Sequence, residues 1–233
     1  MIKSRCSIVC EPKKCKEAFG FECAGCPNIA AAPWGECGVK KCYEEKGLEH
    51  CGSCNDFPCD LLNSFAYDKE QGDDGARIEQ CRKWAEEELK ILTRASEVIN
   101  SKTDYIGDGM GGHAVMSLID ENGYPTSATM TISKADGVNW ISFLTDTHGV
   151  KTQRIAKSNK ACVCLPSSEY HISLVGTIDV ITDPSVKKEH WQDVVKNHYG
   201  SDWNDPNWCV LMFKAEHYNL FFASDDTVAK GKL

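Results

Sequence analysis

The spacing of apolar residues changes along the chain, and the first clear pattern is helical. From Ala76 to about Ser101, apolar side chains recur at steps of three, four or seven, which places them in one stripe of an amphipathic helix. The residues of this stripe are Ile78, Cys81, Ala85, Leu89, Leu92 and Ile99. The sequence therefore predicts one long helix, which we expect to connect two modules.

Beyond Gly107 the apolar residues recur at every second position, as they do in half-buried strands. Three such runs cover residues 112–120, 124–133 and 138–146. The short turn sequences ENG and ADG separate them at hairpin spacing. These runs predict a three-stranded meander.

The rest of the chain adds two helices and three strands. An amphipathic helix is predicted over 150–159, and a second over 184–200, with Asp183 as its N-cap and Pro184 in its first turn. The further strands are predicted over residues 161–166, 171–182 and 209–224. Six strands and flanking helices suit a small antiparallel barrel of the α+β class. An exposed apolar last strand, LMFKAEHYNLFF, is consistent with an interface.

Residues 1–60 show little periodicity, many Gly and Pro, and ten of the 14 cysteines. We expect a small module that is held by something other than a core. Hydrophobic residues make up 42% of the chain and charged residues 26%, which excludes a disordered or fibrous protein. We predict domains over residues 1–75 and 101–233, connected by residues 76–100.

Charge and hydropathy exclude two classes of partner. The net charge is −8, from 34 acidic and 26 basic residues, and no stretch forms a basic platform for nucleic acid. No apolar run is long enough to span a membrane, and the N-terminus has no secretory signal. We therefore expect a cytoplasmic protein with reduced thiols, which favours metal binding over disulfides. The alternative is a loop module with free or oxidised cysteines.

The cysteines include two C-x2-C pairs, in which two thiolates can reach one ion from a single turn. These pairs, Cys23 with Cys26 and Cys51 with Cys54, are the first candidate for a zinc site with four thiolates. Iron or an iron–sulfur cluster is the alternative metal. A possible second set of ligands consists of Cys10, Cys15, Cys37, Cys42 and Cys59.

The cysteine-rich segment resembles a small domain of unknown function from bacterial and archaeal anaerobes. The resemblance covers about residues 6–90 and is most specific in KGLEHCGSC and NDFPC. In this chain Ser7 replaces the usual glycine, and Cys15 is displaced from the usual spacing. The resemblance implies metal binding and assigns no reaction.

Residues 89–233 resemble the pyridoxamine 5'-phosphate oxidase-like split barrels, specifically the general stress protein branch that binds FMN. The resemblance rests on the ordered series LKILTRASEVINS, MSLIDENGYPTSATM, WISFLTDTHGVKTQRIAKSNKACVCL and ISLVGTIDVITDPSVKKEHW. It implies a six-stranded antiparallel split β-barrel with flanking helices. It also implies a homodimer with FMN at the subunit interface.

The resemblance also implies a set of cofactor-binding residues. Lys151, Thr152 and Arg154 stand at or near a helix N-terminus, where a cation, a hydroxyl and the helix dipole suit a phosphate. Ser127 and Ala128 stand where the family often has arginine. The complete implied set is Ser127, Ala128, Thr129, Met130, Leu144, Thr145, Val150, Lys151, Thr152, His171 and Ser173.

These observations predict a flavin-dependent oxidoreductase that acts on an unknown small molecule. Its electrons would come from a nicotinamide or a protein donor, and the flavin would carry the redox chemistry. No catalytic acid or nucleophile is identified, and the motifs of dinucleotide-binding folds and α/β-hydrolases are missing. The alternative is a sensor or electron-transfer protein that binds flavin and metal without turnover.

Overall fold

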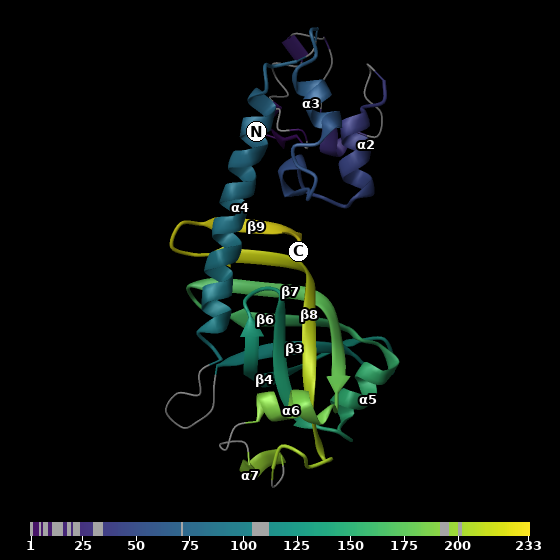
Figure 1. Cartoon of the computed structure of the whole chain (residues 1–233), viewed down its shortest axis with the longest axis vertical. Helices are drawn as coiled ribbons and strands as arrows, with labels where there is room; N and C mark the ends of the chain where they lie inside the picture. Colours follow the sequence, from purple (N-terminus) through teal and green to yellow (C-terminus); the bar gives the residue numbers. More distant parts are fainter. Residues whose placement is uncertain are drawn as a thin grey trace. The chain divides into compact units, whose positions relative to one another are not determined.

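The computed structural model describes residues 2–4, 6, 9–10, 16–17, 20, 24–29, 35–70, 72–103, 112–191, 196–199 and 202–233 (Figure 1). Contacts divide the chain into two compact units, residues 1–90 and 91–231, with Lys232 and Leu233 assigned to one unit each. The boundary falls within the long helix α4 (Ala76–Asn100), whose observed bounds confirm the predicted helix. No helix of the described residues is both long enough and apolar enough to cross a membrane.

The first unit is built from short elements and the beginning of α4. These elements are β1 (Ile2–Lys3), β2 (Val9–Cys10), η1 (Cys26–Asn28), α2 (Gly38–Glu45), η2 (Cys51–Ser53) and α3 (Asp60–Ala66). Val39, Leu62, Ala66 and Ile78 are buried together with Cys6 in one cluster. The expectation of a module without a core is therefore wrong, because α2, α3 and α4 each contribute an apolar side chain to a small one.

The turn η2 is fixed against the first part of α4. Ser53 donates a hydrogen bond of 2.7 Å to the Glu88 carboxylate, and the His50 ring lies 3.6 Å from the same carboxylate oxygen. Gly52 approaches the backbone carbonyl of Cys81 so closely that a Cβ atom would overlap it. A glycine is therefore required between the two cysteines of the C-x2-C turn.

The second unit consists of seven strands and the helices between them. Its elements are β3 (His113–Ile119), β4 (Pro125–Asp136), β5 (Trp140–Asp146), α5 (Val150–Lys157), β6 (Lys160–Pro166), β7 (Tyr170–Ile181), α6 (Pro184–His190), α7 (Lys196–Tyr199), β8 (Trp208–Phe222) and β9 (Thr227–Lys232). The strand order is β5-β4-β3-β6-β7-β8-β9, and an additional antiparallel pairing of β5 with β8 closes six of the strands into a ring. The predicted six-stranded antiparallel barrel is confirmed, with β9 as a seventh strand beside β8.

The barrel core follows the two-residue period of the strands. Ala114, Met116 and Leu118 of β3 point inward, whereas the residues between them lie on the outer face. Phe143 and Phe213 fill the interior from β5 and β8, and each is fully buried. Alternation of this kind is the expected result of strands with one buried face.

The last turns of α4 pack against the turn between β4 and β5. Gly137, at φ 51°, lies so close to Ser96 that a Cβ atom would overlap its side chain. The Gly137 N–H donates to the Asn100 side chain at 2.8 Å, and the Val138 N–H donates to the Ser96 hydroxyl at 3.2 Å. The glycine of the predicted ADG turn is thus required both by its backbone angle and by the adjacent helix.

The C-terminal part differs from the predictions in two elements, one helix and one strand. The helix over 184–200 is interrupted, because α6 ends at His190 and Trp191 has an extended backbone. Residues 192–195 and 200 lie outside the described residues, and α7 is a separate turn. The strand β9 was not predicted, since its side chains alternate only between half-buried and exposed. Most of the apolar side chains of β8 are buried in the core, although Phe221 is 37% exposed.

Candidate functional site

The first half of β4 and the last residues of β5 are not paired with each other, and we call this unpaired stretch of the ring the opening. Paired residues join β4 to β5 only from Ile132 to Asp136, with a bulge between Ile132 and Lys134. Residues 125–131 of β4 pair with β3, and residues 144–146 of β5 pair with β8. The predicted cofactor residues Ser127–Met130 and Leu144–Thr145 therefore lie on the two sides of this opening.

The outer face of the sheet carries hydroxyl groups on the same stretch of β4. Ser127 lies opposite Ser117 of β3, and their hydroxyl oxygens are 2.8 Å apart. Thr129 lies opposite Val115 in the same sheet, one pleat further along. Residues directly opposite each other share a face, so Ser127 and Thr129 present an exposed pair of hydroxyls.

The helix α5 brings the predicted phosphate-binding residues to the barrel. It begins after Gly149, and no carboxylate lies in its first turn. Lys151 is half-buried, Val150 is exposed, and the buried Thr152 donates its hydroxyl hydrogen to the Gly149 carbonyl at 2.7 Å. The free N–H groups of a first helical turn, together with a lysine, suit an anion.

Arg154 provides the strongest evidence for an anionic ligand at this helix. Its Nη1 donates to the Thr126 hydroxyl at 2.6 Å, while its Nε is buried without a hydrogen-bond partner in the described part of the chain. The nearest carboxylate oxygen, of Glu121, is 3.9 Å from Nε. A buried guanidinium nitrogen without a partner is costly, so this donor fits a phosphate group that would satisfy it.

Of the remaining predicted residues of β4 and β5, Met130, Leu144 and Thr145 are buried and Ala128 is half-buried. Ala128 and Met130 alternate with the exposed residues of β4, and Met130 belongs to the barrel core. Leu144 packs with Trp208 and Val210 in a second apolar cluster, and Thr145 is 6% exposed. These side chains would form the walls of the opening, against which a bound ligand would pack.

Two cysteines of β6 lie beside the predicted residues of β7, and neither was among the predicted site residues. Cys164 of β6 lies 3.9 Å from the nearer ring nitrogen of His171, and Cys162 lies 3.6 Å from the Ser173 hydroxyl. Burial, and then the neighbouring Cys162, raise the pKa of Cys164. The strand registers place these two thiols between β3 and β7 on the same outer face. The sequence signal that could have identified these two cysteines is their spacing, because residues at alternate positions of one strand lie on the same face.

The predicted metal ligands separate into three groups. Cys15 and Cys23 lie outside the described residues, and only the backbone of Cys10 is described. Cys26 and Cys37 are half-buried and are not among the residues that line the cavity described next. The other four line a single cavity of the first unit, which we call the thiol cavity: Cys42, Cys51, Cys54 and Cys59. The structure thus groups one C-x2-C pair with two cysteines that the sequence placed in the second set.

The neighbours of Cys51 include two thiols that were in neither predicted set. Burial, and then the charges of Cys81, Cys6, Cys59 and Cys42, raise the pKa of Cys51. Cys6 and Cys81 are themselves buried, at 8% and 0% exposure. Within the described residues, no three His, Cys, Asp or Glu side chains are positioned to hold a metal ion as they stand.

Two known protein families match separate parts of the chain, one in each of its two units. A family described as pyridoxamine 5'-phosphate oxidase like matches residues 103–231, and a family described as a protein of unknown function (DUF3795) matches residues 2–64. No curated protein matches the chain.

Solved structures resemble the barrel. A protein from Clostridium acetobutylicum, described as related to general stress protein 26 of the pyridoxinephosphate oxidase family, is 26% identical, with a TM-score of 0.52. That match covers 62% of this chain and 95% of the other. General stress protein 26 from Bacillus anthracis is 19% identical, with a TM-score of 0.47, over 61% of this chain and 98% of the other. An FMN-binding protein related to pyridoxamine 5'-phosphate oxidase, from Nostoc punctiforme, is 12% identical, with a TM-score of 0.40, over 64% and 96%.

Proposed function

The chain belongs to the pyridoxamine 5'-phosphate oxidase-like family, and from this premise we propose that it is a flavoprotein whose barrel binds FMN. The observation that carries the proposal is the buried Nε of Arg154, which lacks a hydrogen-bond partner in the described residues. FMN differs from riboflavin by its phosphate, and this nitrogen would donate to such a group.

The phosphate would be held at the beginning of α5. Lys151 supplies a positive charge, Arg154 supplies a second, and the N–H groups of Val150 to Thr152 point out of the first turn. Thr126 keeps the Arg154 guanidinium in place through its 2.6 Å hydrogen bond. The beginning of the helix therefore combines the Lys151 cation with a favourable dipole, and Arg154 of the last turn would add a second cation.

The rest of the cofactor would lie along the opening of the barrel. Ser127 and Thr129 offer hydroxyl groups on the β4 side, and Leu144 and Thr145 form the β5 side. When bound, the flavin supplies hydride or single-electron transfer, so the chain needs no catalytic acid of its own. The residues of the barrel bind it, orient it and exclude water from one of its faces.

We further propose that two subunits enclose the cofactor, with His171 and Ser173 contributed by the second. The outer face that carries these residues also exposes apolar side chains: Val175 is 49% exposed and Phe221 37% exposed. His171 lies directly opposite Phe221 in the sheet, so polar and apolar groups share one surface. A subunit interface would cover both.

The proposed activity is that of an oxidoreductase that takes electrons from a nicotinamide or a protein donor and passes them to a small molecule. The test is a titration of the full chain with FMN and with riboflavin, followed by anaerobic addition of NADH or NADPH. The proposal predicts one FMN per chain, tighter binding of FMN than of riboflavin, and bleaching of the flavin by a donor. Absence of FMN binding would refute the flavoprotein; binding without reduction by either nucleotide would refute the nicotinamide-dependent activity and favour a sensor.

A further inference from the structure

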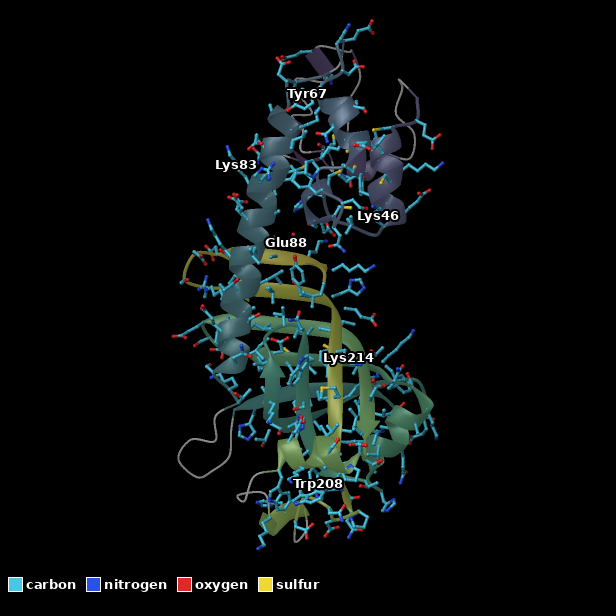
Figure 2. All side chains as sticks on the ribbon, viewed as in Figure 1. Lys46, Tyr67, Lys83, Glu88, Trp208 and Lys214 are labelled. Atoms are coloured by element: carbon cyan, nitrogen blue, oxygen red, sulfur yellow. The ribbon has the colours of Figure 1, made fainter. Side chains whose placement is uncertain are left out.

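The C-x2-C turn of the first unit places its two thiols in different surroundings. Cys51 packs against the small apolar core of the unit and lines the thiol cavity. Cys54 lines the same cavity, but its sulfur contacts the exposed side chains of Lys46 and Asp56. Figure 2 shows Lys46 in this unit, with sulfur atoms gathered around α2 and α3. We propose that the pair is a redox-active dithiol that reduces the disulfides of small thiol compounds, with Cys54 as the attacking sulfur and Cys51 as the resolving one.

The backbone of the turn suits the formation of a disulfide between its two ends. The Cys54 N–H donates to the Cys51 carbonyl at 3.1 Å, which closes the segment into a tight turn. The Cα atoms at the ends of such a turn lie less than about 7 Å apart, and a disulfide spans Cα atoms about 4.4–6.8 Å apart. Gly52, which approaches the backbone of α4, and Ser53, which donates to Glu88 at 2.7 Å, hold the turn in this form. The two sulfurs can therefore join without a large movement of the chain.

A cation and a carboxylate contact the attacking sulfur. The Lys46 ammonium donates to the Cys54 sulfur at 3.2 Å and to the Asp56 carboxylate at 2.8 Å. The same carboxylate oxygen lies 3.9 Å from the Cys54 sulfur. The thiolate is the form of cysteine that attacks a disulfide, and a neighbouring lysine stabilises its charge. Asp56 would accept the proton of the thiol, and Lys46 would stabilise the sulfur once the proton has left.

The lining of the cavity favours a small substrate. Around the thiols and Lys46, its wall consists of apolar and aromatic side chains, among them Leu48, Phe57 and Leu61. Access to the attacking sulfur decides which disulfides can react. The disulfide of a small molecule can enter beside this wall, whereas a disulfide buried in a folded protein cannot approach the sulfur.

The proposed reaction conserves atoms and electrons. The Cys54 sulfur attacks one sulfur of the substrate, the substrate S–S bond breaks, and a mixed disulfide forms while one thiol leaves. The Cys51 sulfur then attacks the Cys54 sulfur, which breaks the mixed disulfide and releases the second thiol. The two cysteines lose two electrons and two protons, and the substrate takes up both to become two thiols. A dithiol compound returns the pair to its reduced form by the reverse exchange.

The test identifies which cysteines react first. The full chain as purified, reduced and desalted, is mixed with one equivalent of glutathione disulfide, quenched by alkylation at successive times and mapped by peptide mass spectrometry. We expect a disulfide between Cys51 and Cys54, with two glutathione thiols released per chain. In C51S the resolving sulfur is missing, so glutathione should remain attached to Cys54. C54S should lower the rate by more than about 10-fold, whereas the matched controls C42S and C59S, from the same cavity, should change it less than about 3-fold.

Two variants of the lysine separate its chemical role from a structural one. K46M keeps both sulfurs and should slow formation of the disulfide by about 10-fold, while K46R, which keeps the charge, should retain most of the rate. Circular dichroism shows that each variant is folded.

Three results would overturn the proposal. Another pair of cysteines could oxidise first, glutathione in C51S could attach elsewhere than to Cys54, or K46M could react as fast as the unchanged chain. A Cys54 that stays unreactive in the chain as purified, protected by a bound metal ion for example, overturns it as well. The site is independent of the proposed flavin, whose titration should be the same in all these variants.

Discussion

Replacement of Arg154 by methionine tests the phosphate site most sharply. The variant removes the buried Nε donor and the guanidinium charge but keeps an unbranched apolar side chain of similar length. A hydrogen bond to a charged group contributes about 1.5–3 kcal/mol, and 1.4 kcal/mol is a factor of ten in affinity. Because the Arg154 side chain remains 25% exposed, we expect the lower part of this range, a rise in the Kd for FMN of about 10- to 30-fold.

The assay is a pair of equilibrium titrations, with FMN and with riboflavin, on the full chain. The loss should be confined to FMN, since riboflavin has no phosphate to contact Arg154. Lys157→Met is the matched control, because it removes an exposed cation from the last turn of the same helix. Equal weakening of both ligands, or an equal effect of Lys157→Met, would refute the assigned role. The lost hydrogen bond to Thr126 should lower the free energy of unfolding by only about 0.5–1.5 kcal/mol.

Three further predictions concern stability, each measured as the free energy of unfolding. Gly176→Ala should lower it by about 1–3 kcal/mol, because the new Cβ would overlap the backbone carbonyl of the paired strand β8 at a bulge. Phe213→Ala should lower it by about 3–5 kcal/mol, whereas the same change at Phe221, on the exposed face, should lower it by less than about 1 kcal/mol. Burial holds the pKa of His190 below its ordinary value, so the unfolded chain binds more protons near pH 6 and stability should fall as the pH drops below about 6.5. His190→Phe should flatten this part of the pH profile.

Each of these predictions has a contradicting result. An unchanged free energy of unfolding for Gly176→Ala would mean that the bulge widens freely, and equal losses at Phe213 and Phe221 would contradict the assignment of the two sheet faces. A pH profile that is identical in the His190 variant would show that folding does not lower the pKa of this side chain.

The regular elements of the barrel could be predicted because their signals are local. The two-residue period marks β3 to β8, and Asp183 caps α6 as expected, accepting hydrogen bonds from the N–H groups of Ser185 and Val186. The end of α6 could not be predicted, because Trp191 leaves the helix to pack near Trp208, with ring centroids 5.6 Å apart. That contact depends on a strand that follows in the sequence. The strand β9 was missed because pairing, not burial of an apolar face, holds it beside β8.

The candidate sites depend more strongly on tertiary structure. Spacing alone identified the pair Cys51 and Cys54, but not which other thiols would join it. Cys42 and Cys59 reach the same cavity because α2 and α3 pack through Val39 and Leu62, which no cysteine spacing encodes. In the barrel, the position of Lys151 in the first turn of a helix could be predicted, whereas Arg154 lies in the last turn of that helix and not at its beginning. The lack of a hydrogen-bond partner for Arg154 Nε could not be predicted, because it depends on how the folded chain buries this nitrogen while Nη1 contacts Thr126 of β4.

The most direct test of the central claim is the visible absorption spectrum of the full chain after incubation with FMN and removal of free cofactor, recorded before and after addition of dithionite. The account predicts a two-peaked flavin band at one FMN per chain that bleaches on reduction and is much weaker in Arg154→Met. A colourless protein after desalting, for a chain that is folded by circular dichroism, would contradict it.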